Sequence, residues 1–157
     1  MLFVRTILSL RALCLLLLIA LAGCSQQPVF HDSDGNAIRF ADYKGQWIVI
    51  NYWATWCKPC FKEMPELNKF YAAHNKNVVM FGVNYDYVSN DQLPALIKRI
   101  DAKFPTLTSD PAKALGVAHV SGLPATVIID PAGRNQEILL GEQTQVSLEK
   151  ALGLKKK

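Results

Sequence analysis

The sequence has little excess of positive charge. Its 157 residues include 17 lysines and arginines against 13 acidic residues, for a formal charge of +4. Arg5 and Arg11 lie in the N-terminal segment 1–23, so the remaining chain carries a side-chain charge of only +2. A protein that binds nucleic acid would need a concentrated basic face. The composition therefore argues against a nucleic-acid partner, and the three lysines that end the sequence do not change this.

Long hydrophobic runs are also missing, apart from one short run near the N-terminus. Eighteen of residues 1–23 are apolar. The uncharged stretch 12–23 is too short to cross a bilayer as a helix, which takes about 20 residues, but it suits the hydrophobic part of a secretory signal. A buried core helix fits less well, because the segment is apolar on every face. We interpret residues 1–23 as a signal peptide.

The predicted signal ends at Gly23, and the sequence Leu21-Ala22-Gly23-Cys24 across this point resembles a bacterial lipobox. After cleavage, Cys24 would be acylated, and residues 24–29 would tether a domain of residues 30–157 to the extracytoplasmic or periplasmic face of a membrane. Ordinary cleavage that leaves Cys24 as a free thiol is the alternative. Ser25 follows Cys24, which favours the outer membrane over the inner one where the organism has both.

The rest of the sequence alternates predicted strands and helices. Run 47–53 is almost entirely apolar and rich in strand-forming residues, which is typical of a strand buried on both faces, and 77–85 is predicted to be a second buried strand. The other predicted elements are a hairpin of residues 29–30 and 37–40, helices over 57–74, 111–115 and 144–152, a helix from Asn90 or Asp91 to 103, a short extended piece at 104–107, and strands at 123–130 and 136–140. This order predicts an α/β sandwich whose sheet ends antiparallel.

Cysteines are few, and only two of the four remain for chemistry in the predicted mature domain. Cys14 leaves with the signal and Cys24 would carry the lipid. Cys57 and Cys60 directly follow a buried strand and begin a helix, whose N-terminus lowers the pKa of a thiol. We therefore expect Cys57 to be partly exposed and nucleophilic. Cys60 would be less accessible and placed to resolve a mixed disulfide.

Two other interpretations of the cysteine pair are weaker. A structural disulfide that closes so short a loop would contribute little stability. A zinc site would need two further ligands, and the sequence has no second cysteine pair and only three scattered histidines. Lys58 adds a positive charge beside the thiolate, and Pro59 suits a first helical turn. We expect a redox-active pair with no metal and no other cofactor.

Residues 53–60 (Trp-Ala-Thr-Trp-Cys-Lys-Pro-Cys) resemble the active-site motif of the thioredoxin superfamily. The continuation 61–65 (Phe-Lys-Glu-Met-Pro) is similar to the membrane-anchored TlpA/ResA-like thiol–disulfide oxidoreductases. The resemblance covers about residues 29–154, with the N-terminal hairpin and an insert at 86–121 between the second and third core strands. It implies a thioredoxin-like fold, with a central mixed sheet flanked by helices. It also implies disulfide reduction outside the cytoplasm, often in cytochrome c maturation.

The same resemblance implies roles for individual residues. Cys57 matches the attacking cysteine and Cys60 the resolving one. Pro124 matches a cis-proline that lies against the pair, so that Leu123 would offer its backbone N–H and C=O to a substrate chain. On spacing alone, Pro124 could equally begin a strand. Trp56 would pack beside the thiols at the substrate-binding surface.

A carboxyl group accompanies the predicted redox pair. Glu63 lies three residues after Cys60 and so shares its helix face. It could exchange a proton with Cys60, with its pKa raised by burial. The alternative is an exposed helical glutamate. Asn51 stands where cytoplasmic thioredoxins carry a buried aspartate, and an amide cannot carry a proton at neutral pH, so proton transfer falls to Glu63 or to water.

The sequence thus predicts a thiol–disulfide oxidoreductase. Reduction is favoured over oxidation, although no rule derives a reduction potential from Lys58 and Pro59. The expected partners are protein disulfides, apocytochrome c among them, and a membrane thiol-reductant donor of the DsbD/CcdA type. The alternative is a peroxiredoxin-like peroxidase, which would carry Thr where this sequence has Ala54. A non-enzymatic metal carrier or chaperone is a further alternative.

Overall fold

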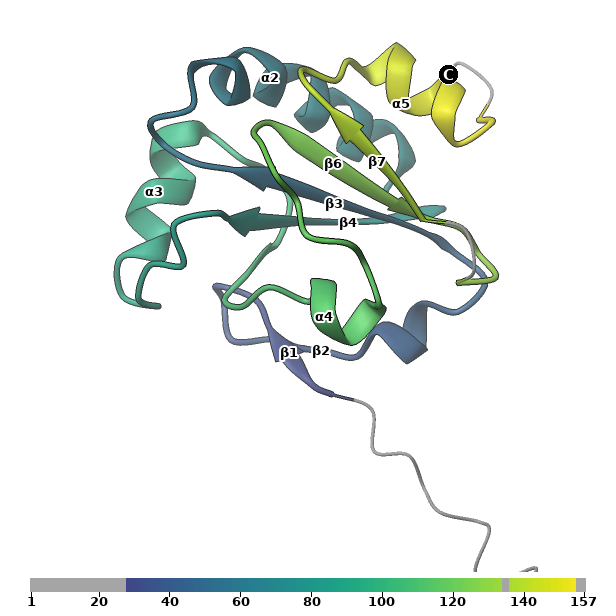
Figure 1. Cartoon of the computed structure of the whole chain (residues 1–157), viewed down its shortest axis with the longest axis horizontal. Coiled ribbons are helices and arrows are strands. Elements are labelled where there is room, and N and C mark those ends of the chain that lie inside the picture. Colours follow the sequence, from purple (N-terminus) through teal and green to yellow (C-terminus); the bar gives the residue numbers. More distant parts are fainter. Residues whose placement is uncertain (1–27, 134–135, 155–157) are drawn as a thin grey trace, which may run out of the picture.

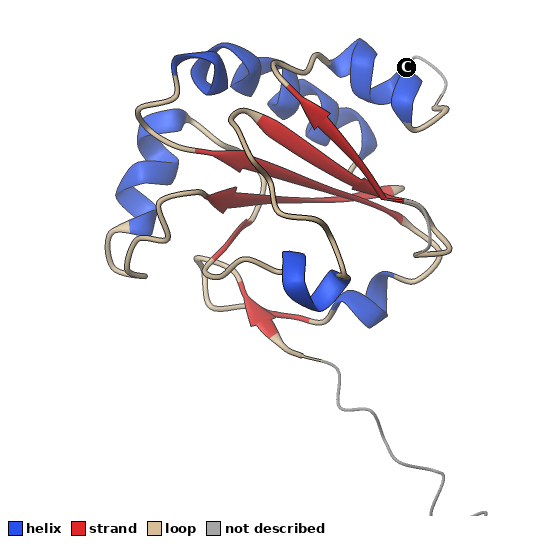
Figure 2. Ribbon diagram, in the orientation of Figure 1, coloured by secondary structure: helices blue, strands red, loops and turns tan. Residues whose placement is uncertain are grey.

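A mixed five-stranded sheet forms the centre of the molecule (Figures 1 and 2). The structure is a computed structural model that describes residues 28–133 and 136–154. In spatial order the strands are β5 (Thr106–Leu107), β4 (Val78–Asn84), β3 (Trp47–Trp53), β6 (Ala125–Ile129) and β7 (Gln136–Leu140). The first three are parallel, whereas β6 pairs antiparallel with both β3 and β7. This confirms the predicted α/β fold and its mixed sheet.

Strand β3 is central because its sequence is apolar on both faces except at Asn51. All of its residues except Trp47 are buried. Ile50 pairs with Phe81 of β4 on one side and with Val127 of β6 on the other. A strand covered on both faces and paired along both edges provides a rigid base for whatever follows its carboxyl end.

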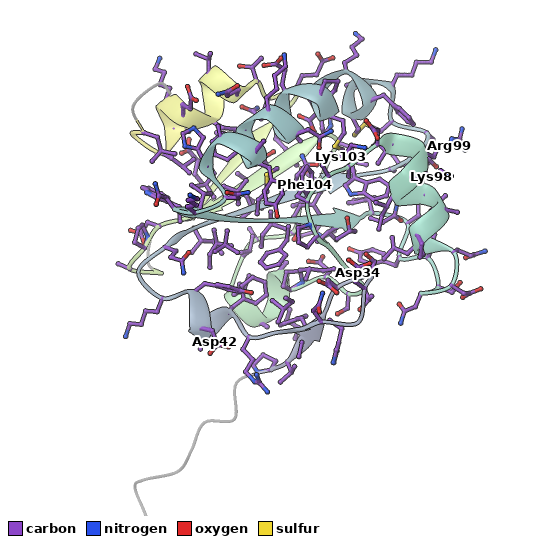
Figure 3. All side chains as sticks on the ribbon, turned by 180° about the vertical axis from the view of Figure 1, so that it is seen from behind. Asp34, Asp42, Lys98, Arg99, Lys103 and Phe104 are labelled. Atoms are coloured by element: carbon purple, nitrogen blue, oxygen red, sulfur yellow. A yellow bond between two sulfur atoms is a disulfide. The ribbon has the colours of Figure 1, made fainter. Side chains whose placement is uncertain are left out.

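Helices cover the two faces of the sheet unequally (Figure 1). The helices α2 (Lys58–His74), α3 (Leu93–Ile100) and α5 (Gln145–Ala151) contribute to one buried cluster, with Val49, Trp53, Met64, Leu67, Phe70 and Leu148 in its interior. Lys98 and Arg99 lie on the outer side of α3 (Figure 3). The opposite face carries α4 (Ala112–Leu115), the 3₁₀ helix η1 (Phe40–Tyr43) and a hairpin of β1 (Phe30–His31) and β2 (Ala37–Ile38).

The hairpin also covers the exposed edge of β5. The N–H of Ser33 donates to the carbonyl of Thr106 at 2.8 Å, and the N–H of Thr108 donates to the carbonyl of His31 at 2.9 Å. Within the turn, the carboxylate of Asp32 accepts hydrogen bonds from the backbone N–H groups of Asp34 and Asn36. Pairing an edge strand in this way removes a template for association with another chain.

Most predicted boundaries differ from those observed by one to three residues, and two of these differences have a clear cause. The second hairpin strand ends at Ile38, and Phe40 instead begins η1, where its ring packs edge-on against Phe81. The helix predicted to start from Asn90 or Asp91 begins at Leu93. The carbonyl of Ser89 accepts hydrogen bonds from the N–H groups of Gln92 and Leu93, which closes a turn just ahead of the helix. Pro94 then falls in the first helical turn, where no N–H donor is required.

The predicted signal peptide (1–23), Cys24 and most of the predicted tether (24–29) lie outside the described residues. Within the described ranges, no helix is long and apolar enough to cross a membrane.

Candidate functional site

The two cysteines lie at the start of α2, just after the carboxyl end of β3. Cys57 and Cys60 form a disulfide with an S–S distance of 2.08 Å. Cys57 is the N-cap residue of α2, and its sulfur accepts a hydrogen bond from the N–H of Cys60 at 3.2 Å. A sulfur in this position faces the positive end of the helix dipole, which stabilises a thiolate when the disulfide is reduced.

Cys57 is more covered than the sequence suggested. Cys57 is 4% exposed and Cys60 is fully buried. The expectation of a partly exposed Cys57 is therefore wrong for the disulfide form, although the order of accessibility is as predicted. The reason is packing, because both cysteines belong to the buried cluster of the α2 face, and Leu123 packs against that cluster.

The residues that flank the pair differ sharply in exposure. Lys58 begins α2 and is exposed, and Pro59 occupies the second helical position. Trp53 is fully buried, whereas Trp56 is 63% exposed. The indole N–H of Trp56 donates to the carboxylate of Asp86, at 2.9 and 3.1 Å from its two oxygens. The ring is thus oriented at the surface beside the disulfide.

The segment before β6 reaches the same place from the other side of the sheet. The Leu123–Pro124 peptide bond is cis, as the resemblance implied. The carbonyl of Pro124 accepts a hydrogen bond from Gly141 at 2.9 Å. Within the described residues, neither the N–H nor the C=O of Leu123 takes part in a backbone hydrogen bond.

Glu63 is buried one helical turn beyond Cys60. Its side chain is only 2% exposed. One carboxylate oxygen accepts from the side-chain amide of Asn51 at 2.8 Å, and the other accepts from the backbone N–H of Gln143 at 2.8 Å. Both donors are neutral. The alternative of an exposed glutamate is excluded by this burial.

Burial raises the pKa of Glu63 to about 7. Loss of solvation, which penalises the charged carboxylate, is the largest cause, and the negative charge of Glu142 adds to it. The hydrogen bonds from Gln143 and Asn51 act in the opposite direction and lower the pKa. A carboxyl group with a pKa near neutrality can both accept and donate a proton under physiological conditions.

Sequence reasoning missed two contacts of the site. Gln143 contributes through its backbone N–H, which leaves no signature in the type of residue. Asp86 supports Trp56 from the loop after β4, and no local pattern marks that pairing. By contrast, the sequence marks Asn51 as a departure from cytoplasmic thioredoxins, but it does not predict the hydrogen bond from Asn51 to Glu63.

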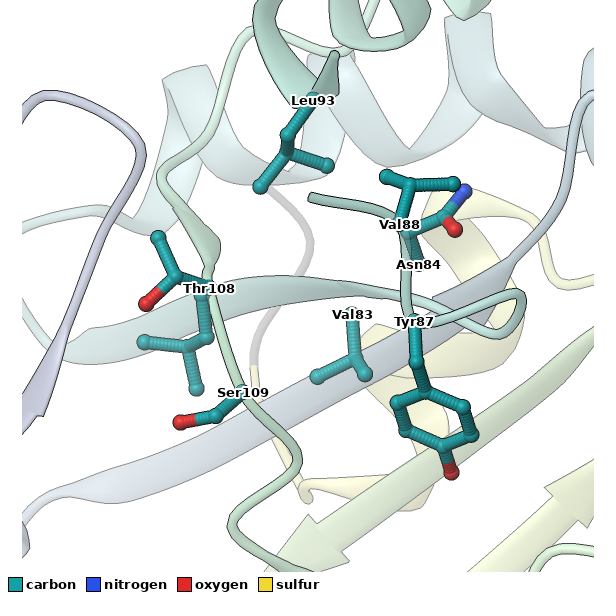
Figure 4. A pocket seen from close by; sticks show the side chains of 8 residues that line it. Val83, Asn84, Tyr87, Val88, Leu93, Thr108 and Ser109 are labelled. Carbon is teal, nitrogen blue, oxygen red and sulfur yellow. The ribbon is translucent and has the colours of Figure 1, made fainter. Parts of the chain in front are cut away.

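A small pocket lies at the ends of β4 and β5, beside the start of α3 (Figure 4). It is lined by Val83, Asn84, Tyr87, Val88, Leu93, Leu107, Thr108 and Ser109. None of the residues predicted for the redox site lines it, so we assign it no part in that site.

Comparisons with known proteins agree with this geometry. Residues 24–138 match the model of the AhpC/TSA family. The thiol–disulfide oxidoreductase ResA of Bacillus cereus is 36% identical over 122 residues, which cover 77% of this chain and 70% of that protein. ResA of Bacillus subtilis is 29% identical over 127 residues, covering 80% and 70%.

Solved structures share the fold. StoA from Bacillus subtilis is 26% identical, with a TM-score of 0.62 over 79% of this chain and 96% of StoA. The exposed lipoprotein thioredoxin Etrx1 from Streptococcus pneumoniae is 23% identical, with a TM-score of 0.69 over 80% of this chain and 97% of Etrx1. Together with the disulfide at the start of α2, these similarities place the chain in the AhpC/TSA family, among the ResA-type thiol–disulfide oxidoreductases with a thioredoxin fold.

Proposed function

We propose that this enzyme reduces disulfide bonds of proteins outside the cytoplasm through Cys57 and Cys60. The observation that carries the proposal is the disulfide at the N-terminus of α2, with a buried carboxyl group on the same helix and an unpaired backbone segment at Leu123 packed against the cluster. The relatives named ResA are thiol–disulfide oxidoreductases, which supports thiol–disulfide exchange as the reaction.

The proposed cycle begins with the reduced enzyme. The thiolate of Cys57 attacks one sulfur of a substrate disulfide, forms a mixed disulfide and releases the other substrate sulfur as a thiolate. Cys60 then loses its proton to the carboxylate of Glu63 and attacks the sulfur of Cys57. The mixed disulfide breaks, and the second substrate sulfur leaves and is protonated. Two electrons have passed to the substrate, and the enzyme ends with the Cys57–Cys60 disulfide.

The substrate chain would be held by the backbone of Leu123 beside cis-Pro124, as an added extended segment. The exposed ring of Trp56 would contact the same chain, since Asp86 fixes its orientation. Lys58 and Pro59 would set the electrostatics and geometry of the first helical turn.

The oxidised enzyme needs a reductant, because the extracytoplasmic environment does not supply one. We propose a membrane thiol-reductant donor of the DsbD/CcdA type. We further propose anchoring through a lipid on Cys24 and apocytochrome c as one substrate, which rests on the resemblance to TlpA/ResA-like proteins. Fractionation of cells that express Cys24→Ser tests the anchor: the variant is expected to leave the membrane fraction.

Replacing Cys57 with Ser tests the proposed activity. Reduction of insulin disulfides is expected to fall at least 100-fold, since the attacking sulfur is lost. Unchanged activity would contradict the proposal. The matched variant Cys60→Ala keeps the attack but cannot resolve it, so mixed disulfides should accumulate on Cys57 and identify the substrates in vivo.

Two further measurements separate the alternatives. A reduction potential near about −120 mV, as in strong oxidants, would contradict a reductase. Peroxide consumption that depends on Cys57 and exceeds insulin reduction would favour the peroxiredoxin-like alternative instead. Ala54, buried beside the pair, offers no hydroxyl to activate a peroxide.

A further inference from the structure

Asn51 joins two parts of the site that lie far apart in the sequence. Its amide nitrogen donates to Glu63 of α2 at 2.8 Å and to the hydroxyl oxygen of Thr126 of β6 at 3.2 Å. Thr126 lies two residues after Pro124, in the strand that begins where a substrate chain is proposed to pair. All three side chains are buried, and Asn51 and Thr126 are fully so.

The orientation of the Asn51 amide is set by its donor end. Among the described residues, the amide oxygen is buried and has no hydrogen-bond partner. An unpaired buried acceptor is destabilising, because its lost contact with water is not replaced. When Glu63 is ionised, the reverse orientation would bring that oxygen against a carboxylate oxygen, which is repulsive. In the observed orientation the amide oxygen lacks a hydrogen-bond partner, while the N–H groups donate to Glu63 and Thr126.

Among the described residues, no positively charged side chain is a partner of the Glu63 carboxylate. Strands β3 and β6 present the neutral side chains of Asn51 and Thr126, and the loop before α5 presents a backbone N–H. Glu142 on that loop is exposed and negative, and its partner is Lys62 at 3.5 Å. On α2, Glu66 pairs with Lys69, and at the far end of the helix His74 pairs with Glu149. Cys60 is neutral in the disulfide.

We propose that Asn51 is a positioning residue for the reaction. Its amide holds the ionised carboxylate of Glu63 in place to take the proton of Cys60, and it links that carboxylate to Thr126 on the strand beside the proposed substrate-binding segment. This inference rests on the proposed function, because it requires Glu63 to act as the base. Without the amide, the buried carboxyl group would stay protonated over a wider pH range and could not accept a proton from Cys60 at neutral pH.

The test follows resolution of a mixed disulfide as a function of pH. Cys57 is loaded with a chromogenic aromatic thiol, and its release by Cys60 is timed. We expect a rate increase with a midpoint near the pKa of Glu63, which Glu63→Gln abolishes. In Asn51→Leu the midpoint should move to higher pH by about one unit, since a hydrogen bond to a charged group is lost. A carbon-13 NMR titration of the Glu63 carboxyl should show the same displacement.

Two more variants separate positioning from a purely structural role. Asn51→Asp keeps the shape but sets a second carboxyl group against Glu63, so the single step should split into two. Asn84→Leu removes another buried asparagine, on β4, and should leave the midpoint unmoved even if it lowers stability. A midpoint that stays in place in both Asn51 variants would overturn the inference.

The result also separates this inference from the proposed function. If Cys57→Ser abolishes insulin reduction and Glu63→Gln abolishes the pH step, but Asn51→Leu does not displace it, only the role of Asn51 is wrong. If the wild-type protein shows no step that depends on Glu63, both the use of Glu63 as a base and the role of Asn51 are wrong.

Discussion

Two buried glutamates on different helices of one face, Glu63 and Glu149, have different environments. Glu63 is bonded to an amide and a backbone N–H, both neutral. Glu149 lies 3.0 Å from the imidazole of His74 and also accepts from the amide of Gln145 at 2.8 Å. The first is near the disulfide, whereas the second joins α5 to the C-terminal end of α2.

This difference suits Glu63 to proton exchange and Glu149 to holding two helices together. A buried acid with neutral partners keeps a pKa near neutrality, so its charge changes easily. A buried acid beside an imidazole gains a partner that can itself be charged, and it ties two helices together. The comparison predicts that changes at Glu63 affect pH dependence, whereas changes at the His74–Glu149 pair affect stability.

The largest expected effect is on stability, from breaking the His74–Glu149 pair. His74→Ala removes one partner of a buried pair and should lower the free energy of unfolding by about 3–5 kcal/mol. Denaturant titration measures this loss. The double variant His74→Phe with Glu149→Leu replaces the pair with apolar side chains and should recover most of the stability. A loss below about 1 kcal/mol in His74→Ala would mean that the pair behaves like a surface pair.

The second effect is the pH dependence of stability that comes from Glu63. Its folded pKa of about 7 lies above the ordinary value of 4.5, so the folded state binds the proton more tightly. The resulting stabilisation is complete below pH 4.5 and is lost as the pH rises through 7, by about 3 kcal/mol in total. Glu63→Gln should abolish this loss between pH 5 and pH 8, as measured by denaturant unfolding of the oxidised protein.

Glu66→Gln provides the control for that experiment, because Glu66 lies half-buried on the same helix and its pKa is lowered by the hydrogen bonds from Lys69 and Gln145. It should leave the loss of stability between pH 5 and pH 8 in place. If Glu63→Gln retains the same slope as the wild-type protein, the slope does not come from Glu63.

The smallest effect is expected from Glu142, whose charge raises the pKa of Glu63 from the surface. Glu142→Gln should lower that pKa slightly and, because its ion pair with Lys62 is exposed, change the stability by less than about 1 kcal/mol. A carboxyl NMR titration detects the displacement. An upward displacement would contradict the assigned sign of the interaction.

Local features of the sequence were enough to predict most of the elements. The apolar run 47–53 became the central strand, and β7 has the predicted bounds. The position of Cys57 and Cys60 at the start of a helix also followed from a strand, a proline at the second helical position and a short spacing. The strand end predicted at Phe40 and the helix start predicted at Asn90 or Asp91 were wrong. Packing of Phe40 against Phe81 ends the strand at Ile38 instead, and a turn closed by the carbonyl of Ser89 delays the helix to Leu93.

The sequence by itself determined the order of strands and helices, the redox pair and the presence of a carboxyl group on the same helix face. Only the tertiary structure decided how that carboxyl group is held. Its partners Asn51 and Gln143 are 12 and 80 residues away along the chain. Local spacing cannot specify contacts that arise when a strand, a helix and a loop pack together, and one of these contacts uses a backbone N–H that every residue except proline possesses.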